Sequence, residues 1–139
     1  MSTNEINIFT DGGSRGNPGQ AAIGVYIEDL NGKTLALIGK RLGIATNNVA
    51  EYKAVLEALD WVISSGEQYV KINFYLDSNL VMSQLNGLFK IKNAALRELL
   101  FSAKQKETTI KSPITYKYIP REQNKKADSL VNQALDYLI

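Results

Sequence analysis

The sequence contains no cysteine and no histidine among its 139 residues. The lack of cysteine excludes disulfide bonds and thiolate metal sites. The lack of histidine excludes Ser-His-Asp triads, Cys-His dyads and imidazole acid-base chemistry. If the protein is an enzyme, its chemistry must therefore be carried out by carboxylates, hydroxyls, amines or bound metal ions.

Long hydrophobic runs are also missing. No apolar stretch approaches the roughly 20 residues that span a bilayer, and the N-terminal MSTNEINIFT lacks the basic and apolar segments of a signal peptide. We therefore expect a cytoplasmic protein with no membrane partner. The composition, 45% hydrophobic and 22% charged, suits one domain over residues 1–139, because no linker, repeat or low-complexity tract divides the chain.

The net charge of +2 conceals an uneven distribution. Residues 90–126 hold ten Lys or Arg and three acidic residues, a net charge of +7, whereas residues 1–89 carry −3 and residues 127–139 carry −2. A charged run is commonly a solvated surface, and the alternative is a binding surface for a polyanion such as nucleic acid. Composition alone leaves both interpretations open.

Hydrophobic periodicity in the first half of the chain changes from strand to helix. Alternating apolar residues predict strands in INIFT, in AIGVYI and from Thr34 to Leu42, with Asn31-Gly32 as a two-residue hairpin turn. Helical spacing begins at Val49 and stops at Gly66. The first 45 residues are therefore predicted to form an antiparallel meander, followed by an amphipathic helix.

The second half alternates strands with helices. VKINFYLD and ITYKYIP predict strands, and helices are predicted in SNLVMSQL, NAALRELLFSAKQKE and NKKADSLVNQALDYLI. The complete order β-β-β-α-β-α-α-β-α predicts an α/β fold with a five-stranded mixed sheet, whose first three strands are antiparallel, flanked by helices.

Two aspartates stand where predicted strands end. Ligands of such sheets bind at the carboxyl ends of the strands, so Asp11 and Asp77 are candidate site residues. Each also has a structural explanation. Asp11 can stabilise a turn with the glycines that follow it, and Asp77 can cap the helix that begins after Ser78. Taken singly, neither aspartate distinguishes a binding site from a turn or a helix cap.

Two further acids lie in the first turns of predicted helices. Glu51 follows Asn48 by three residues, which fits a capping box, and Asp128 would interact favourably with the dipole of the last helix. However, Glu51 shares the core-facing stripe with Val55 at i+4, and Asp128 shares one with Val131 at i+3. Capping does not explain why these acids are directed toward the core.

The four acids converge if strand ends and helix starts meet at one edge of the sheet. Mutual repulsion would then raise their pKa values and destabilise the fold unless divalent cations neutralise them. Ligation by oxygen alone is typical of Mg²⁺ or Mn²⁺. Two such ions can activate a water and stabilise the leaving oxygen of a phosphodiester without any histidine.

Four segments of the chain resemble the type 1 ribonuclease H family (ribonuclease HI). They are FTDGGSRGNPG at 9–19, TNNVAEYKAVLEAL at 46–59, YLDSNLVMSQLNG at 75–87 and IPREQNKKADSLVNQAL at 119–135. Any one is a weak signal, but all four occur in the family's order and at its spacing, over nearly the whole chain.

The resemblance implies a ribonuclease H-like fold and an endonuclease acting on RNA–DNA hybrids. Such an enzyme hydrolyses the RNA strand with two Mg²⁺ ions, which Mn²⁺ can replace, and leaves 3′-hydroxyl and 5′-phosphate ends. The family's catalytic and metal-binding carboxylates correspond to Asp11, Glu51, Asp77 and Asp128.

The resemblance also implies a set of contacts with the hybrid. Backbone and amide contacts correspond to Gly12, Gly13, Asn17, Asn47 and Asn48, a contact near a DNA phosphate to Thr46, and one near the scissile region to Asn79. Phe89 stands where related enzymes often carry an aromatic residue, and Phe89 and Lys90 are expected to contact the substrate as well. Asn47 and Asn48 also suit helix capping, while amides hydrogen-bond 2′-hydroxyls and bases well.

One departure from the family concerns the loop before the last acid. Many members place a histidine there, which is thought to help product release or orient water. Here TYKYIPREQNKKAD has none. Arg121, Glu122 and Lys125 are the candidates to replace it, and slower turnover is the alternative.

Two further departures affect the surface and the residue before Asp77. Some members insert a basic helix after the second helix, which this chain lacks, so Lys90, Lys92 and Arg97 would offer a reduced phosphate-binding surface. Leu76 precedes Asp77 where a small polar residue is common, and we expect little effect.

Two other functions compete with hybrid cleavage. A non-catalytic hybrid- or RNA-binding module would also use the basic segment 90–126, but a pure binder gains nothing from acids beside a phosphate backbone. Another nuclease of the same fold, such as a resolvase or transposase-like enzyme, fits less well with NNVAEYKAV and DSNLVMSQLNG. We expect a monomer, and whether double-stranded RNA or RNA–DNA junctions are also cut stays open.

Overall fold

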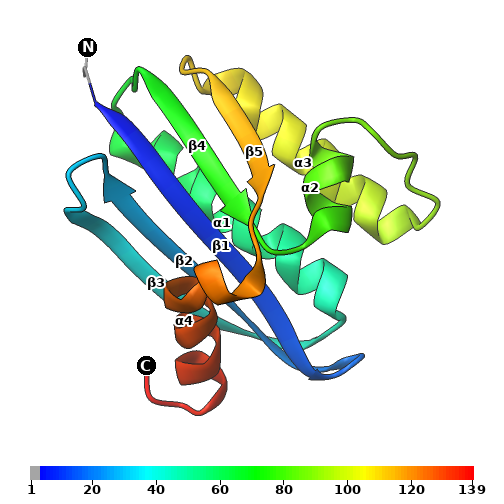
Figure 1. The fold of residues 1–139 in the computed structure, drawn as a ribbon. Helices are drawn as coiled ribbons and strands as arrows, with labels where there is room; N and C mark the ends of the chain where they lie inside the picture. Colours follow the sequence, from blue (N-terminus) through cyan, green and yellow to red (C-terminus); the bar gives the residue numbers. More distant parts are fainter. Residues whose placement is uncertain (1–3) are drawn as a thin grey trace.

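A computed structural model provides the structure of residues 4–139. Five strands form one sheet in the order β3-β2-β1-β4-β5 (Figure 1). They are β1 (Glu5–Gly16), β2 (Gly19–Asp29), β3 (Thr34–Ala45), β4 (Lys71–Leu76) and β5 (Ile114–Tyr118). The first three strands pair antiparallel, whereas β1 pairs with β4, and β4 with β5, in parallel. The predicted mixed sheet is confirmed.

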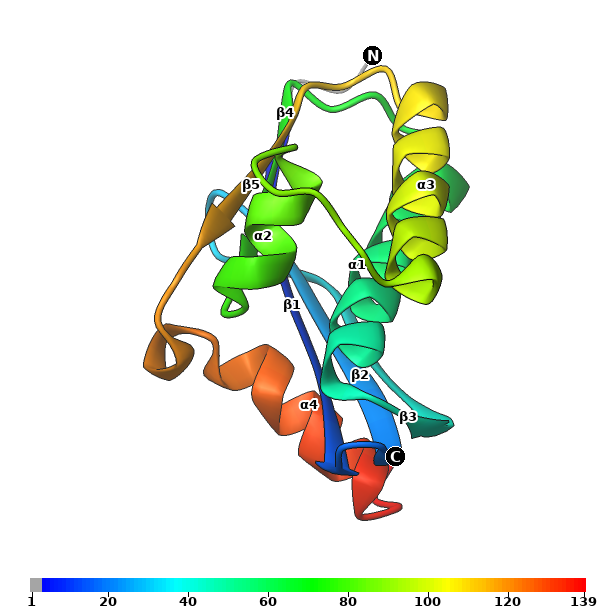
Figure 2. The same cartoon turned by 90° about the vertical axis from the view of Figure 1, so that its right-hand side faces the viewer.

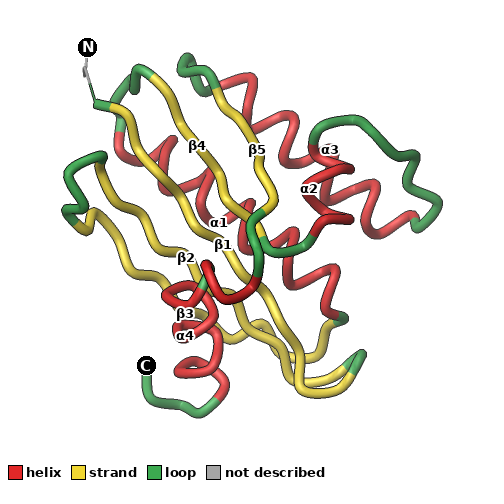
Figure 3. The backbone as a smooth tube through the Cα atoms, in the orientation of Figure 1, coloured by secondary structure: helices red, strands yellow, loops and turns green. Residues whose placement is uncertain are grey.

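Helices lie on both sides of this sheet. The long helix α1 (Asn47–Ser65) and α3 (Ala94–Thr109) lie on one side, and α4 (Lys125–Leu135) lies on the other (Figure 2). The short helix α2 (Asn79–Leu85) lies near β5, and a 3-10 helix, η1 (Arg121–Gln123), leads into α4 (Figure 3). None of the described helices is long and apolar enough to cross a membrane.

The main core lies between the sheet and α1. Ile6 and Ile8 of β1 are buried there with Phe74 of β4 and with Tyr52 and Leu59 of α1. A smaller cluster lies under α4, where Ala22 packs with Val131 and Ala134. The two faces of the sheet therefore pack against different helices, because successive side chains of a strand point to opposite sides.

The structure corrects the predicted end of the first strand. β1 does not end at Asp11 but continues to Gly16, because β2 pairs with it along this whole length. What ends nearby is the parallel pairing with β4, whose last pair is Thr10 with Leu76. Asp11 thus follows the end of the β1–β4 pairing rather than the end of its own strand.

Other predicted boundaries also differ. The connection between β2 and β3 is longer than the two-residue turn predicted at Asn31-Gly32, and the Asp29 carboxylate accepts hydrogen bonds from the N–H groups of Asn31 and Lys33. β3 extends beyond Leu42 to Ala45, and α4 ends at Leu135 rather than at the C-terminus. Local polar side chains and long-range pairing move these boundaries, which periodicity alone does not show.

Candidate active site

The four acids selected from the sequence line one cavity of about 420 Å³. Asp11 lies within β1, Asp77 directly follows β4, Glu51 lies in α1, and Asp128 lies in the first turn of α4. The cavity lies where the pairing of β1 with β4 ends, directly after Thr10 and Leu76. The sheet and the starts of two helices on opposite faces thus bring the carboxylates together.

Three of these carboxylates are close enough to bind the same metal ion. Asp11, Glu51 and Asp77 each offer an oxygen atom, and these atoms all lie within 4.8 Å of one another. Asp11 and Glu51 are buried, whereas Asp77 and Asp128 are partly exposed. Asp128 is near enough to act electrostatically on both Asp11 and Asp77.

Glu51 is not part of a capping box, contrary to one interpretation of the sequence. The N-cap of α1 is Thr46, whose side-chain oxygen accepts a hydrogen bond from the N–H of Val49 at 3.3 Å. Glu51 lies beyond the capping positions, and its Oε1 accepts a hydrogen bond from the Gly12 N–H at 3.2 Å. Its Oε2 is buried with no hydrogen-bond partner in the described structure.

Gly12 allows α1 to approach β1 closely enough to place Glu51. A Cβ atom at Gly12 would lie 2.2 Å from the carbonyl carbon of Ala50 and 2.4 Å from the nitrogen of Glu51. Any side chain would therefore collide with the helix backbone. The glycine of the DGG motif is explained by this helix contact rather than by a turn.

Asp77 is not a helix cap either. Ser78 caps α2, with its side-chain oxygen accepting a hydrogen bond from the N–H of Val81 at 3.2 Å. Asp77 Oδ2 instead accepts a hydrogen bond from Asn124 Nδ2 at 3.2 Å. Asp128 does lie in the first turn of α4, so its favourable interaction with the helix dipole holds alongside its position in the cavity.

Burial and proximity make the acids hold protons more tightly. Burial raises the pKa of Asp11 to about 7, and the negative charges of Asp77 and Asp128 add to the rise. The pKa of Glu51 is also raised, first by burial and then by repulsion from Asp11. Burial raises the pKa of Asp77, although Asn124 and the charge of Arg121 oppose that rise.

This donor set fits divalent cations. The cavity offers carboxylate oxygens, one of which, Glu51 Oε2, is buried without a partner. Clustered carboxylates repel one another unless a positive charge is placed between them. Ligands made of oxygen alone suit Mg²⁺ or Mn²⁺.

Some of the predicted substrate contacts line the same cavity. Gly12, Gly13, Asn47 and Asn48 all line it. The N–H of Gly12, however, already donates a hydrogen bond to Glu51. Asn47 Oδ1 accepts a hydrogen bond from the Ser14 N–H at 2.9 Å, while the Asn47 N–H donates to Asn17 Oδ1 at 3.0 Å. Asn17 and Asn47 thus connect the β1–β2 hairpin to the start of α1.

Other predicted contacts lie elsewhere. Thr46 caps α1, and Asn79 is an exposed residue at the start of α2. Phe89 and Lys90 are exposed in the connection between α2 and α3, and neither lines the acidic cavity. The role of these residues in substrate binding stays a prediction.

The structure adds a residue that the sequence analysis did not select. Asn124 is 1% exposed, and its Nδ2 donates hydrogen bonds to Asp77 Oδ2 and, at 2.9 Å, to the Thr10 carbonyl. Its position four residues before Asp128 was the available signal, but an asparagine next to a helix start is usually explained as a cap. No side-chain capping hydrogen bond forms here.

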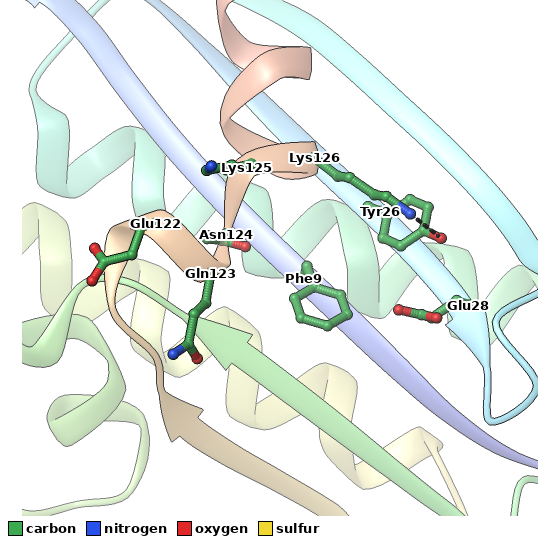
Figure 4. A pocket seen from close by; sticks show the side chains of 8 residues that line it. All are labelled: Phe9, Tyr26, Glu28, Glu122, Gln123, Asn124, Lys125 and Lys126. Carbon is green, nitrogen blue, oxygen red and sulfur yellow. Dashed lines mark hydrogen bonds between the residues drawn. The ribbon is translucent and has the colours of Figure 1, made fainter.

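The structure also separates the candidates for replacing the missing loop histidine. Arg121 lines the acidic cavity. Glu122 and Lys125 line a different cavity, between η1 and β2 (Figure 4). Of the three candidates, only Arg121 is therefore placed to act near the acids.

Comparison with known proteins gives a consistent result. The family described as "Reverse transcriptase-like" matches residues 9–134. Bifunctional protein Rv2228c of Mycobacterium tuberculosis is 36% identical over 133 residues, which are 95% of this chain and 36% of that protein. Ribonuclease HI of Halobacterium salinarum is 36% identical over 131 residues, 94% of this chain and 64% of that protein. The chain thus spans about a third of the mycobacterial relative.

Solved structures show the same fold. RNase H1 from Halobacterium salinarum superposes with a TM-score of 0.89 at 36% identity, covering 96% of this chain and 98% of the other. LC11-RNase H1, isolated from compost and crystallised in complex with an RNA/DNA hybrid, gives a TM-score of 0.92 at 38% identity, covering 96% and 98%. From the fold, the cavity of acids and these similarities, we conclude that the chain belongs to the type 1 ribonuclease H family.

Proposed function

We propose that this chain is an endonuclease that hydrolyses the RNA strand of RNA–DNA hybrids by two-metal-ion catalysis. The observation that carries the proposal is the group of carboxylate oxygens from Asp11, Glu51 and Asp77 within 4.8 Å of one another. In a protein that only bound nucleic acid, this group would weaken binding, because the acids repel phosphates in the absence of cations. Membership of the ribonuclease H family supports the same activity.

The proposed cofactor is Mg²⁺, two ions per site, which Mn²⁺ can replace. Asp11, Glu51, Asp77 and Asp128 would hold these ions. When bound, such ions generate a nucleophilic water and stabilise the leaving oxygen of the phosphodiester, giving 3′-hydroxyl and 5′-phosphate ends.

The chain's own groups supply orientation and strand choice. Asn124 holds the Asp77 carboxylate, and Gly12 holds that of Glu51. Asn48 lines the cavity beside them and is available to bind the 2′-hydroxyls by which RNA differs from DNA. Arg121 also lines the cavity and provides a positive charge near Asp77.

Cleavage of a hybrid labelled on either the RNA or the DNA strand tests the proposal. We expect RNA fragments only, formed with Mg²⁺ and not with a chelator. Asp77→Asn should abolish cleavage while leaving the metal-free melting temperature unchanged or higher, because one of the repelling charges is removed. Hybrid binding without cleavage of either strand, in the presence of Mg²⁺ or Mn²⁺, would instead establish a binding module.

A further inference from the structure

Part of the sheet face opposite α1 is not covered by a helix. In Figure 1 the upper parts of β1, β4 and β5 face the viewer, and α4 lies only over the lower part of the sheet. Figure 2 shows the same open region from the side. Because Ile6 and Ile8 face the core, the neighbouring Asn7 and Phe9 of β1 point to this open face.

Three aromatic side chains lie side by side on this face of the sheet, and one of them, Tyr26, is buried. Phe9 pairs across the sheet with Tyr26 of β2 and Tyr75 of β4. The Phe9 and Tyr75 rings stack with centroids 5.0 Å apart and an angle of 21°, and Phe9 lies 6.0 Å from Tyr26. Lys126 lies over the Tyr26 ring at 4.3 Å and donates a hydrogen bond to its hydroxyl. Phe9 and Tyr75 remain partly exposed.

A cavity of about 250 Å³ opens at these aromatic side chains (Figure 4). Phe9, Tyr26 and Glu28 line it from the sheet, and residues 122–126 line it from the junction of η1 and α4. Two acids, Glu28 and Glu122, balance two lysines in the lining, so the cavity itself selects no charge. An aromatic wall with the amide of Gln123 beside it suits a planar, uncharged group that forms hydrogen bonds.

The junction of η1 and α4 separates this cavity from the acidic one. Arg121 lines the acidic cavity, whereas the following residues line the aromatic one. Asn124 belongs to the aromatic lining and binds Asp77 through Nδ2. The two cavities are therefore neighbours across this junction, with consecutive residues of η1 lining one and then the other.

We propose that the open face binds unpaired nucleotides of single-stranded nucleic acid, with a base stacked on Phe9. Gln123 would hydrogen-bond the base, and the exposed Lys117, which pairs with Tyr75, and Lys125 would lie beside phosphates. Stacking accepts every base, so this binding has little sequence preference. A blunt duplex cannot use the face, because its bases are stacked on one another. This binding needs no metal and therefore goes beyond the proposed cleavage.

Fluorescence anisotropy of a labelled single-stranded oligothymidylate, with a chelator present, tests this proposal. We expect Phe9→Leu, which keeps apolar bulk but removes the ring, to weaken binding about fivefold or more, as loss of one stacked base does. Lys125→Gln and Gln123→Ala should also weaken it. Lys111→Gln, an exposed lysine in the same basic segment, is the matched control and should change the affinity by at most about twofold.

The affinity for a blunt RNA–DNA hybrid serves as the second readout, and Phe9→Leu should leave it unchanged. Equal loss of single-strand and hybrid binding would overturn the proposal, as would wild-type oligothymidylate binding by Phe9→Leu. If Phe9→Leu fails to fold, the variants Lys125→Gln and Gln123→Ala at exposed positions provide the test. Single-strand affinities equal to that of the Lys111→Gln control would then overturn the proposal.

Discussion

Asn124 connects the backbone of β1 to one of the four acids. Asn124→Ala removes the donor to both the Thr10 carbonyl and Asp77. We expect a loss of about 1–3 kcal/mol in the free energy of unfolding, the usual cost of a buried unsatisfied polar group. Because Asp77 also loses its orientation, kcat should fall more than KM rises. Urea denaturation and steady-state kinetics measure the two effects.

Gln133→Ala in the same helix is the control, since it removes only an exposed side-chain hydrogen bond to Ser129. Wild-type kcat in Asn124→Ala, together with lowered stability, would show that Asn124 is structural only.

Burial and the negative charges of Asp77 and Asp128 oppose the charge of Asp11 and raise its pKa to about 7. Asp11→Asn keeps the shape and removes the charge. We expect hybrid cleavage to be lost and the metal-free melting temperature at pH 8 to stay the same or rise. Asp60→Asn, at an exposed ion pair with Lys106, is the control and should keep full activity. A large fall in the melting temperature of Asp11→Asn would assign the residue a structural role.

The close packing of α1 on β1 depends on the lack of a side chain at Gly12. Gly12→Ala would place a Cβ within 2.4 Å of the α1 backbone, so the helix must move. We expect destabilisation at or above the usual 1–3 kcal/mol of an overpacked site, with loss of activity through Glu51. Gly13→Ala is the matched control, because its Cβ would meet only the Val131 side chain at 3.7 Å. Chemical denaturation of both variants compares them, and equal stabilities would contradict the packing argument.

At the start of α1, different residues cap the helix and line the cavity. Thr46 caps the helix, so Thr46→Ala should cost about 1 kcal/mol of stability and Thr46→Ser should restore most of it. Asn48 lines the cavity and is not the cap, so Asn48→Ala should leave stability nearly unchanged and slow hybrid cleavage. Melting temperatures and cleavage rates of the three variants test this. Full activity in Asn48→Ala would remove it from the substrate contacts.

At the scale of the whole molecule, the acid cluster makes metal-free stability depend on pH. Asp11 has a pKa of about 7 in the folded protein against 3.8 ordinarily, so between these values the folded state binds more protons than the unfolded state. The free energy of unfolding must therefore decrease as the pH rises through this range, and the raised pKa values of Glu51 and Asp77 act in the same direction.

Urea denaturation in a chelator at pH 5 and pH 8 measures this effect. We expect lower stability at pH 8, recovery when Mg²⁺ is added, and a weaker pH dependence in Asp11→Asn. Stability that increases from pH 5 to pH 8 without metal would show that the acids do not repel one another as the geometry indicates.

The sequence by itself determined the order of the elements and selected four acids that the structure places around one cavity. Periodicity depends on neighbouring residues, so it located the strands and the helices. Gly66 likewise predicted the end of α1, and in the structure this glycine adopts the left-handed conformation that ends the helix. The acids were found because Glu51 and Asp128 break the apolar stripes of their helices, and because four motifs share the order and spacing of one family.

Only the tertiary structure decided how these parts are held. β1 continues to Gly16 because β2 pairs with it, and Thr46 rather than Asn48 caps α1. The bonds from Asn124 to β1 and Asp77, and the open aromatic face, join residues far apart in the chain. Such contacts depend on strand pairing and helix approach over long sequence separations, which no local pattern records.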